Sequence, residues 1–159
     1  MRKAILCLAV FGLASALWAA DPIVGTWKLN VAKSKIAIPD SAPKEIIEYY
    51  SAMKEWTEIY REIAGDQMEL ESTEEPAGKF VWPRQGGVVT VEEGAPLWAT
   101  HIEILIEPGN WYVTLLKDEK QVMVMHKTFS KDGNTMQQTC TFRDPQGKFI
   151  EMPLVFDKQ

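Results

Sequence analysis

The sequence has little cysteine, little histidine and no excess of basic residues. Its 159 residues include two cysteines and two histidines, too few for a disulfide framework or a structural zinc site. It carries 17 basic and 22 acidic side chains, a formal net charge of −5, whereas a nucleic-acid-binding surface must be basic. These shortages exclude disulfide-scaffold, structural-zinc and nucleic-acid-binding proteins.

Motifs of hydrolases and nucleotide-binding proteins are also missing. The chain contains neither Gly-x-Ser-x-Gly nor His-Glu-x-x-His, and no cysteine has the sequence context of a catalytic nucleophile. Arg84-Gln85-Gly86-Gly87 lies between two expected strands, whereas a phosphate-binding glycine loop joins a strand to a helix. We therefore predict a protein that is not an enzyme and has no catalytic residue, no cofactor and no metal site.

The first twenty residues have the pattern of a cleavable signal peptide. Arg2 and Lys3 precede an apolar run that ends in small residues at Ala19 and Ala20. The run is short for a membrane span, and its charges are all at the front. We predict that residues 1–20 are a signal peptide cleaved near Ala20. The protein is then exported, to the periplasm or out of the cell, and is not an integral membrane protein.

Residues 21–159 are long enough for one domain and too short for two. Removal of the signal peptide leaves 139 residues with 15 basic and 22 acidic side chains, a formal charge of −7. Two halves of such a chain could not each bury an adequate core without disulfides or metals. Cys140 is the one cysteine left, so no internal disulfide can form, and we expect a buried thiol.

Short runs of β-type composition follow one another along most of this domain. In Ala99–Glu107 three isoleucines, at 102, 104 and 106, fall on one face, and His101, Glu103 and Glu107 fall on the other, which predicts a half-buried strand. The connectors are rich in Asp, Gly, Asn and Pro, which tight turns require. The expected strands are Val24–Asn30, Met68–Ser72, Phe80–Trp82, Val88–Glu92, Ala99–Glu107, Trp111–Leu116, Gln121–Phe129, Thr135–Phe142 and Phe149–Phe156. No strand–helix–strand alternation appears, so we predict an all-β antiparallel sandwich or barrel of about ten strands.

The segment from Ser41 to Ala64 fits two interpretations. Apolar and aromatic residues recur there at steps of three and four, which is typical of one long helix. Its second half also alternates as a strand does, and a turn at Gly65-Asp66 would pair it with the next strand. We favour a short helix from about Pro43 to Met53, followed by a strand from about Glu55 to Ile63.

The first expected strand contains Gly25-Thr26-Trp27 directly after the signal peptide. This Gly-x-Trp resembles the lipocalin signature. Three further segments resemble the small exported lipocalin-like proteins of bacteria: Lys33-Ser34-Lys35, the run from Ser130 to Met136 and the ending Val155–Gln159. The resemblance implies an antiparallel up-and-down β-barrel of about 8–10 strands, lipocalin-like or similar to fatty-acid-binding proteins, with a short helix after the first strand. It also implies a small apolar molecule inside.

The resemblance gives Gly25 and Trp27 structural roles. In lipocalins the tryptophan at the Trp27 position packs across the closed end of the barrel, and an arginine near the last strands covers it. Arg143 is the one late arginine of this chain, so the resemblance implies that Arg143 covers Trp27.

A closed barrel also has no exposed strand edges, which an open sheet of about ten strands would present to other chains. Pro153 lies within the last expected strand and cannot donate to a ladder. That strand must therefore carry a bulge or an unpaired position there.

The candidate ligand-binding residues are aromatic, basic or histidine side chains of the expected strands and turns: Tyr60, Trp82, Arg84, Trp111, His126 and Arg143. Large aromatic residues either line a pocket, where they stack on a flat or long apolar ligand, or fill a small barrel completely. Those that bear on this choice are Trp27, Trp56, Trp82, Trp98, Trp111, Tyr60 and Tyr112.

Three of these candidates carry specific hypotheses. His126 shares a face with Val122 and Val124, so it is a candidate to point into the barrel, as a ligand contact, a haem ligand or a structural histidine. Both faces of the expected strand Gln121–Phe129 are apolar from Val122 to Met125. If the ligand has a buried carboxylate, Arg84 or Arg143 is its expected charge partner.

Three functional hypotheses follow from the sequence. The first is an exported binding protein for a small apolar or amphipathic ligand. The second is an envelope structural or assembly module with a filled barrel and no ligand. The third is an enzyme that uses His126 or a pocket carboxylate, which the missing catalytic motifs disfavour. The sequence leaves the oligomeric state and the ligand's identity open.

Overall fold

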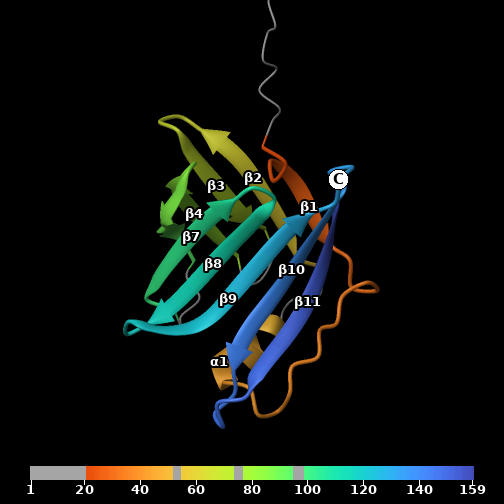
Figure 1. Ribbon diagram of the computed structural model, residues 1–159, viewed down its shortest axis with the longest axis vertical. Coiled ribbons are helices and arrows are strands. Elements are labelled where there is room, and N and C mark those ends of the chain that lie inside the picture. The colour runs from red at the N-terminus through yellow and green to blue at the C-terminus, as the bar shows by residue number, and fades with distance from the viewer. Residues whose placement is uncertain (1–20, 52–54, 74–76, 95–98) are drawn as a thin grey trace, which may run out of the picture.

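Antiparallel pairing of short strands builds one sheet that curls into a barrel (Figure 1). The computed structural model describes residues 21–51, 55–73, 77–94 and 99–159. The elements are β1 (Gly25–Leu29), α1 (Lys44–Ser51), β2 (Thr57–Ile63), β3 (Gln67–Ser72), β4 (Gly78–Pro83), β5 (Gly86–Val88), β6 (Thr90–Glu93), β7 (His101–Glu107), β8 (Asn110–Lys117), β9 (Lys120–Phe129), β10 (Thr135–Arg143) and β11 (Phe149–Lys158). The expected signal peptide lies outside the described residues.

The barrel is nearly closed. The 11 strands run in the order β5-β7-β8-β9-β10-β11-β1-β2-β3-β4-β6, and the last strand returns to the first through the pair Trp27↔Lys158. The two ends of this order, β5 and β6, are separated by Val89 alone, whose N–H donates to Ile102 O at 2.9 Å. One bent run from Gly86 to Glu93 therefore bridges β7 and β4. The predicted all-β antiparallel barrel is confirmed.

The segment after β1 divides as predicted, into a short helix and then a strand. The N–H of Ile46 donates to Pro43 O, and α1 begins at Lys44, since proline is well suited to the first turn of a helix. Ile46 and Tyr50, four residues apart, lie on one face of the helix and are buried. In Figure 1, α1 lies at the end of the barrel opposite the C-terminus. Met53, the expected helix end, lies outside the described residues.

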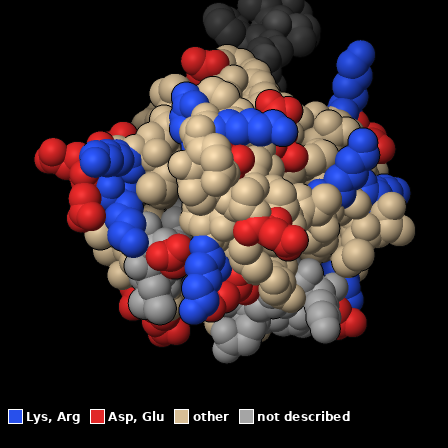
Figure 2. All heavy atoms as spheres, turned by 90° about the horizontal axis from the view of Figure 1, so that it is seen from below, with Lys and Arg blue, Asp and Glu red and all other residues tan. Residues whose placement is uncertain are grey.

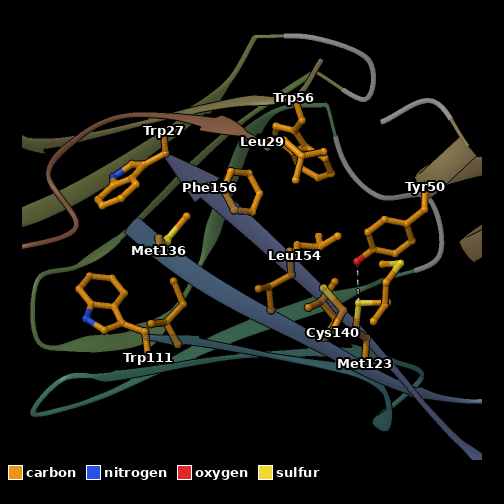
Figure 3. Close-up of a cluster of buried hydrophobic side chains, with 14 of the residues drawn as sticks. Trp27, Leu29, Tyr50, Trp56, Trp111, Met123, Met136, Cys140, Leu154 and Phe156 are labelled. Carbon is orange, nitrogen blue, oxygen red and sulfur yellow. Dashed lines mark hydrogen bonds between the residues drawn. The ribbon is translucent and has the colours of Figure 1, made fainter. Parts of the chain in front are cut away.

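Side chains of β9, β10 and β11 fill one half of the barrel interior. Those with almost no exposed surface are Met123, Met136, Cys140, Met152, Leu154 and Phe156. Figure 3 shows Tyr50 of α1 pointing toward Met123 and Cys140, and the Tyr50 hydroxyl donates a hydrogen bond to Met123 Sδ at 3.2 Å. The helix is thus anchored to this filled half by a buried aromatic residue.

Trp27 packs at the other end of the barrel and is fully buried. Its Nε1 donates to Ile23 O at 2.7 Å, and its ring centroid lies 5.8 Å from that of Phe129. The cation over its ring is Lys158, whose Nζ lies 5.1 Å from the ring centroid. The implied Arg143–Trp27 contact is therefore wrong.

Strand register explains this correction. Arg143 pairs with Phe149 at one end of β11, whereas Trp27 pairs with Lys158 at the other end. A strand rises about 3.3 Å per residue, so the two positions are about 30 Å apart. The Arg143 guanidinium lies 3.6 Å from the centroid of the Phe149 ring and donates to Gly147 O at 2.8 Å.

Gly25 is required by its backbone conformation. Its φ is +138°, a value that residues with a side chain rarely adopt, and an added Cβ would lie 2.7 Å from Lys158 Cε. The lysine stem crosses this glycine, and its ammonium group reaches the Trp27 ring. Gly25 and Trp27 of the Gly-x-Trp motif are therefore parts of one packing unit with Lys158.

Pro153 needs no bulge. The register between β10 and β11 is continuous through Thr139↔Pro153. On the other side of β11, β1 pairs only with the residues from Phe156 onward. Before Phe156 the neighbour of β11 is the loop after β1, whose Lys35 N–H donates to Pro153 O at 2.8 Å. The missing amide of the proline therefore faces a loop and interrupts no strand ladder.

Charged groups of both signs are interspersed on the face seen in Figure 2, at the end of the barrel where α1 lies, and neither sign covers that face. Among the described residues, no helix is long and apolar enough to cross a membrane.

Candidate ligand-binding cavity

A cavity lies in the half of the barrel that the core side chains leave open. It offers about 70 Å³ to the centres of water molecules, room for on the order of five waters. Its lining comes from Ile23, two residues before β1, and from β2, β3, β4, β7, β8, β9 and their connections. In the described part of the chain, no lining residue comes from α1, β10 or β11. The barrel is thus half filled and half open, a combination of the two outcomes expected for its aromatic residues.

The cavity wall is mainly apolar and aromatic. Trp82 is its central aromatic residue, with its ring edge-on to Trp111 and to Tyr60, at centroid distances of 6.3 Å in both pairs. These three are among the residues predicted from the sequence to contact a ligand. Trp56 also lines the cavity, Trp27 does not, and Trp98 lies outside the described residues.

Two charged side chains, Glu58 and Lys127, face each other in this apolar wall. Lys127 Nζ lies 3.0 Å from Glu58 Oε2, and the two side chains are 4% and 3% exposed. The Tyr60 hydroxyl donates to the same Oε2 at 2.6 Å and accepts a hydrogen bond from Lys127 Nζ. The ammonium group also lies 5.1 Å from the centroid of the Tyr60 ring. We call these three residues the buried triad.

The buried triad joins opposite parts of the barrel wall. Glu58 and Tyr60 come from β2 and Lys127 from β9, 69 residues further along the chain from Glu58. Removing two charges from water costs several kcal/mol per ion, about as much as their attraction recovers. The pair is therefore weak evidence for stability, and each ion depends on the other for compensation.

Trp82 has one polar atom that the described residues leave unsatisfied. The residue is 2% exposed, and its Nε1 has no hydrogen-bond partner. Buried indole N–H groups usually find an acceptor, so this one needs an explanation. Trp82 is also one of the residues that line the cavity.

His126 does not line the cavity, and its interpretation as an inward-pointing residue is wrong. Its ring stacks on Tyr112 at a centroid distance of 4.6 Å, and Nε2 lies 2.8 Å from Asn110 Oδ1. Side chains alternate along β9, and the lining residues Met125 and Lys127 occupy the other parity. His126 is therefore on the outer face of the wall.

Neither predicted arginine reaches the cavity. Arg84 forms an ion pair with Glu62, and its backbone N–H donates to Asp66 O at 2.9 Å, which holds it at the turn after β4. Arg143 stacks on Phe149 at the far end of the filled half. Among the described residues that line the cavity, Lys127 is the basic one, so the two arginines predicted as charge partners of a ligand do not lie in the cavity.

Glu58 and Lys127 were not among the candidate residues predicted from the sequence. A signal was present in the flanking residues. Lys127 has Met125 and Phe129 two positions away on either side, and Glu58 has Trp56 and Tyr60. A charge flanked at both i−2 and i+2 by large apolar residues shares its strand face with them.

Two other ionisable groups with shifted pKa values, Glu69 and Cys140, do not line the cavity. Hydrogen bonds from Lys79, and then from Arg61, hold the pKa of Glu69 below its ordinary value, on the outer side of β3. Burial raises the pKa of the Cys140 thiol. The described residues contain no group of three or more His, Cys, Asp or Glu side chains placed to hold a metal ion.

No family model matches the sequence, and no curated protein matches it significantly. Solved structures do share its fold. Apo lipid binding protein 8 of Caenorhabditis elegans is 15% identical, with 91% of this chain and 100% of that chain covered and a TM-score of 0.59. Fatty-acid-binding protein 1 of Echinococcus granulosus is 14% identical, with 86% and 97% covered and a TM-score of 0.56. Zebrafish ileal bile acid-binding protein, solved with cholic acid, is 14% identical, with 87% and 100% covered and a TM-score of 0.58. The chain therefore has the fold of the calycin-type lipid-binding barrels.

Proposed function

We propose that this protein is an exported, non-enzymatic binding protein that holds a small apolar or amphipathic molecule inside its barrel. The observation that carries the proposal is the apolar, aromatic-lined cavity with a few polar groups set into its wall, which is the usual make-up of a small-molecule site. The named functions of the three fold neighbours, which bind lipids, fatty acids or bile acids, support the same class of ligand. Export rests on the signal-peptide pattern of residues 1–20.

The alternative functions have less support. A structural module with a completely filled barrel would not keep a cavity of about 70 Å³. An enzyme built on His126 would need this residue beside a buried carboxylate, and its ring nitrogen instead lies 2.8 Å from the Asn110 side chain. Glu58 is a carboxylate in the cavity wall, but it is held by Lys127 and Tyr60.

Native mass spectrometry of protein purified from its own host, followed by extraction of bound molecules, tests the proposal. We expect an apolar or amphipathic molecule to be released. Val113→Trp, which fills the cavity from β8, should abolish its recovery. Thr114→Trp, the neighbouring position on the outer face, is the matched control and should retain it. A hydrophilic ligand, or equal recovery from both variants, would contradict the proposal.

A further inference from the structure

We infer that the buried triad makes the cavity selective for a neutral ligand whose polar end both donates and accepts hydrogen bonds, such as an alcohol or an amide. A carboxylate of the same chain length is disfavoured. The inference rests on the proposed function, because it specifies the chemical class of ligand for the same cavity.

The net charge of the cavity wall is the first reason. Among the described lining residues, Glu58 and Lys127 are the two that carry charge, and they are opposite in sign and 3.0 Å apart. A ligand carboxylate beside the Lys127 ammonium group would also lie beside the Glu58 carboxylate, so attraction and repulsion largely cancel. Arg84 and Arg143 are held outside the cavity and supply no further positive charge.

Desolvation is the second reason. An ion moved from water into an apolar cavity must be paired and hydrogen-bonded there, or the transfer is strongly unfavourable. A ligand carboxylate that displaced Glu58 from Lys127 would leave the Glu58 carboxylate buried without its cation, with the same cost. A neutral alcohol or amide has a far smaller desolvation cost and leaves the ion pair intact.

The hydrogen-bonding groups left over in the wall are the third reason. An ammonium group has three donors, and within the described residues Lys127 uses two of them, on Glu58 and Tyr60. Both hydrogen bonds that Glu58 receives there go to Oε2, so Oε1 can still accept one. Trp82 Nε1, whose ring packs against Tyr60, adds an unsatisfied donor. Donors together with an acceptor match a hydroxyl or an amide, whereas an ionised carboxylate can only accept.

Calorimetric titration with three ligands of one chain length tests the inference. Octan-1-ol, octanoate and octylammonium have the same tail and differ in charge, and all three are titrated into the purified protein near neutral pH. We expect octan-1-ol to bind about tenfold or more tightly than either ion. Octanoate binding as tightly as octan-1-ol would overturn the inference and leave the proposed function standing. No binding of any of the three would overturn both.

Glu58→Gln provides the second measurement. This change leaves the Lys127 charge without its partner, so octanoate should gain about tenfold in affinity while octan-1-ol changes by less than about threefold. Glu103→Gln, a carboxylate-to-amide change at an exposed position of β7, is the matched control and should leave all three affinities as in the wild type. An unchanged octanoate affinity in folded Glu58→Gln would overturn the inference. If this variant does not fold, the comparison of the three ligands on the wild-type protein decides.

Discussion

Replacing Lys127 by methionine should strongly destabilise the fold, because it leaves Glu58 charged and uncompensated inside the barrel. The Glu58 side chain is 3% exposed, and Lys127 is the one cation bonded to it among the described residues. Breaking a buried ion pair by removing one partner typically costs about 3–5 kcal/mol of unfolding free energy. This is a large share of the roughly 5–15 kcal/mol that stabilises a typical domain.

The same reasoning predicts recovery when the whole buried triad is replaced by apolar residues. In Glu58→Met/Tyr60→Phe/Lys127→Met no ion or hydroxyl remains to be compensated, and apolar substitutes for buried ion pairs are often neutral or stabilising. We expect this triple variant to unfold within about 1 kcal/mol of the wild type, or above it. The loss in the single variant would then be identified as the cost of an isolated buried charge.

Urea unfolding followed by tryptophan fluorescence measures these differences, with the slope m checked for constancy across the variants. Lys28→Met, at an exposed position of β1, is the control and should change stability by less than about 0.5 kcal/mol. The reasoning would be refuted if Lys127→Met cost less than about 1 kcal/mol, since Glu58 would then be adequately hydrated. A triple variant as unstable as the single one would refute it as well.

Three further measurements test other parts of the structure. Trp27→Ala should lower the unfolding free energy by about 3–5 kcal/mol because it empties a fully buried aromatic site, and a measured loss below about 1 kcal/mol would contradict the packing described here. Lys79 and Arg61 lower the pKa of Glu69, so this residue stabilises the fold at pH values above its ordinary pKa of 4.5, and its contribution disappears as the pH falls through the lowered pKa. In thermal melts at a series of pH values, Glu69→Gln should therefore lose less stability on acidification than the wild type does. An equal loss in both proteins would count against the ion pairs of Glu69. Burial raises the pKa of Cys140, so a thiol reagent should label it rapidly only in concentrated guanidinium chloride, and rapid labelling of the native protein would show an open barrel wall.

Local pattern was sufficient to predict most of the strands and most element boundaries. Alternating isoleucines predicted β7, and the turn residues between apolar runs predicted the hairpins from β7 to β11. The division of the segment after β1 into α1 and β2 was also correct, because the change from helical to alternating periodicity is a property of neighbouring residues. The residue pattern allowed a sandwich or a barrel. The resemblance to lipocalins implied the barrel, and the cost of exposed strand edges agreed with it.

Only the tertiary structure decided which residues meet inside the barrel. Both faces of β9 are apolar between Val122 and Met125, so periodicity could not assign an inner face, and the structure places Lys127 inside and His126 outside. The pairing of Lys127 with Glu58 depends on the curvature that brings β9 opposite β2, two strands that are not neighbours in the sheet. The amino-acid sequence by itself determined an all-β antiparallel fold, since strand formation depends on local side-chain alternation. The polarity of the cavity depends on contacts between residues far apart in the chain, and these exist only once the sheet has closed.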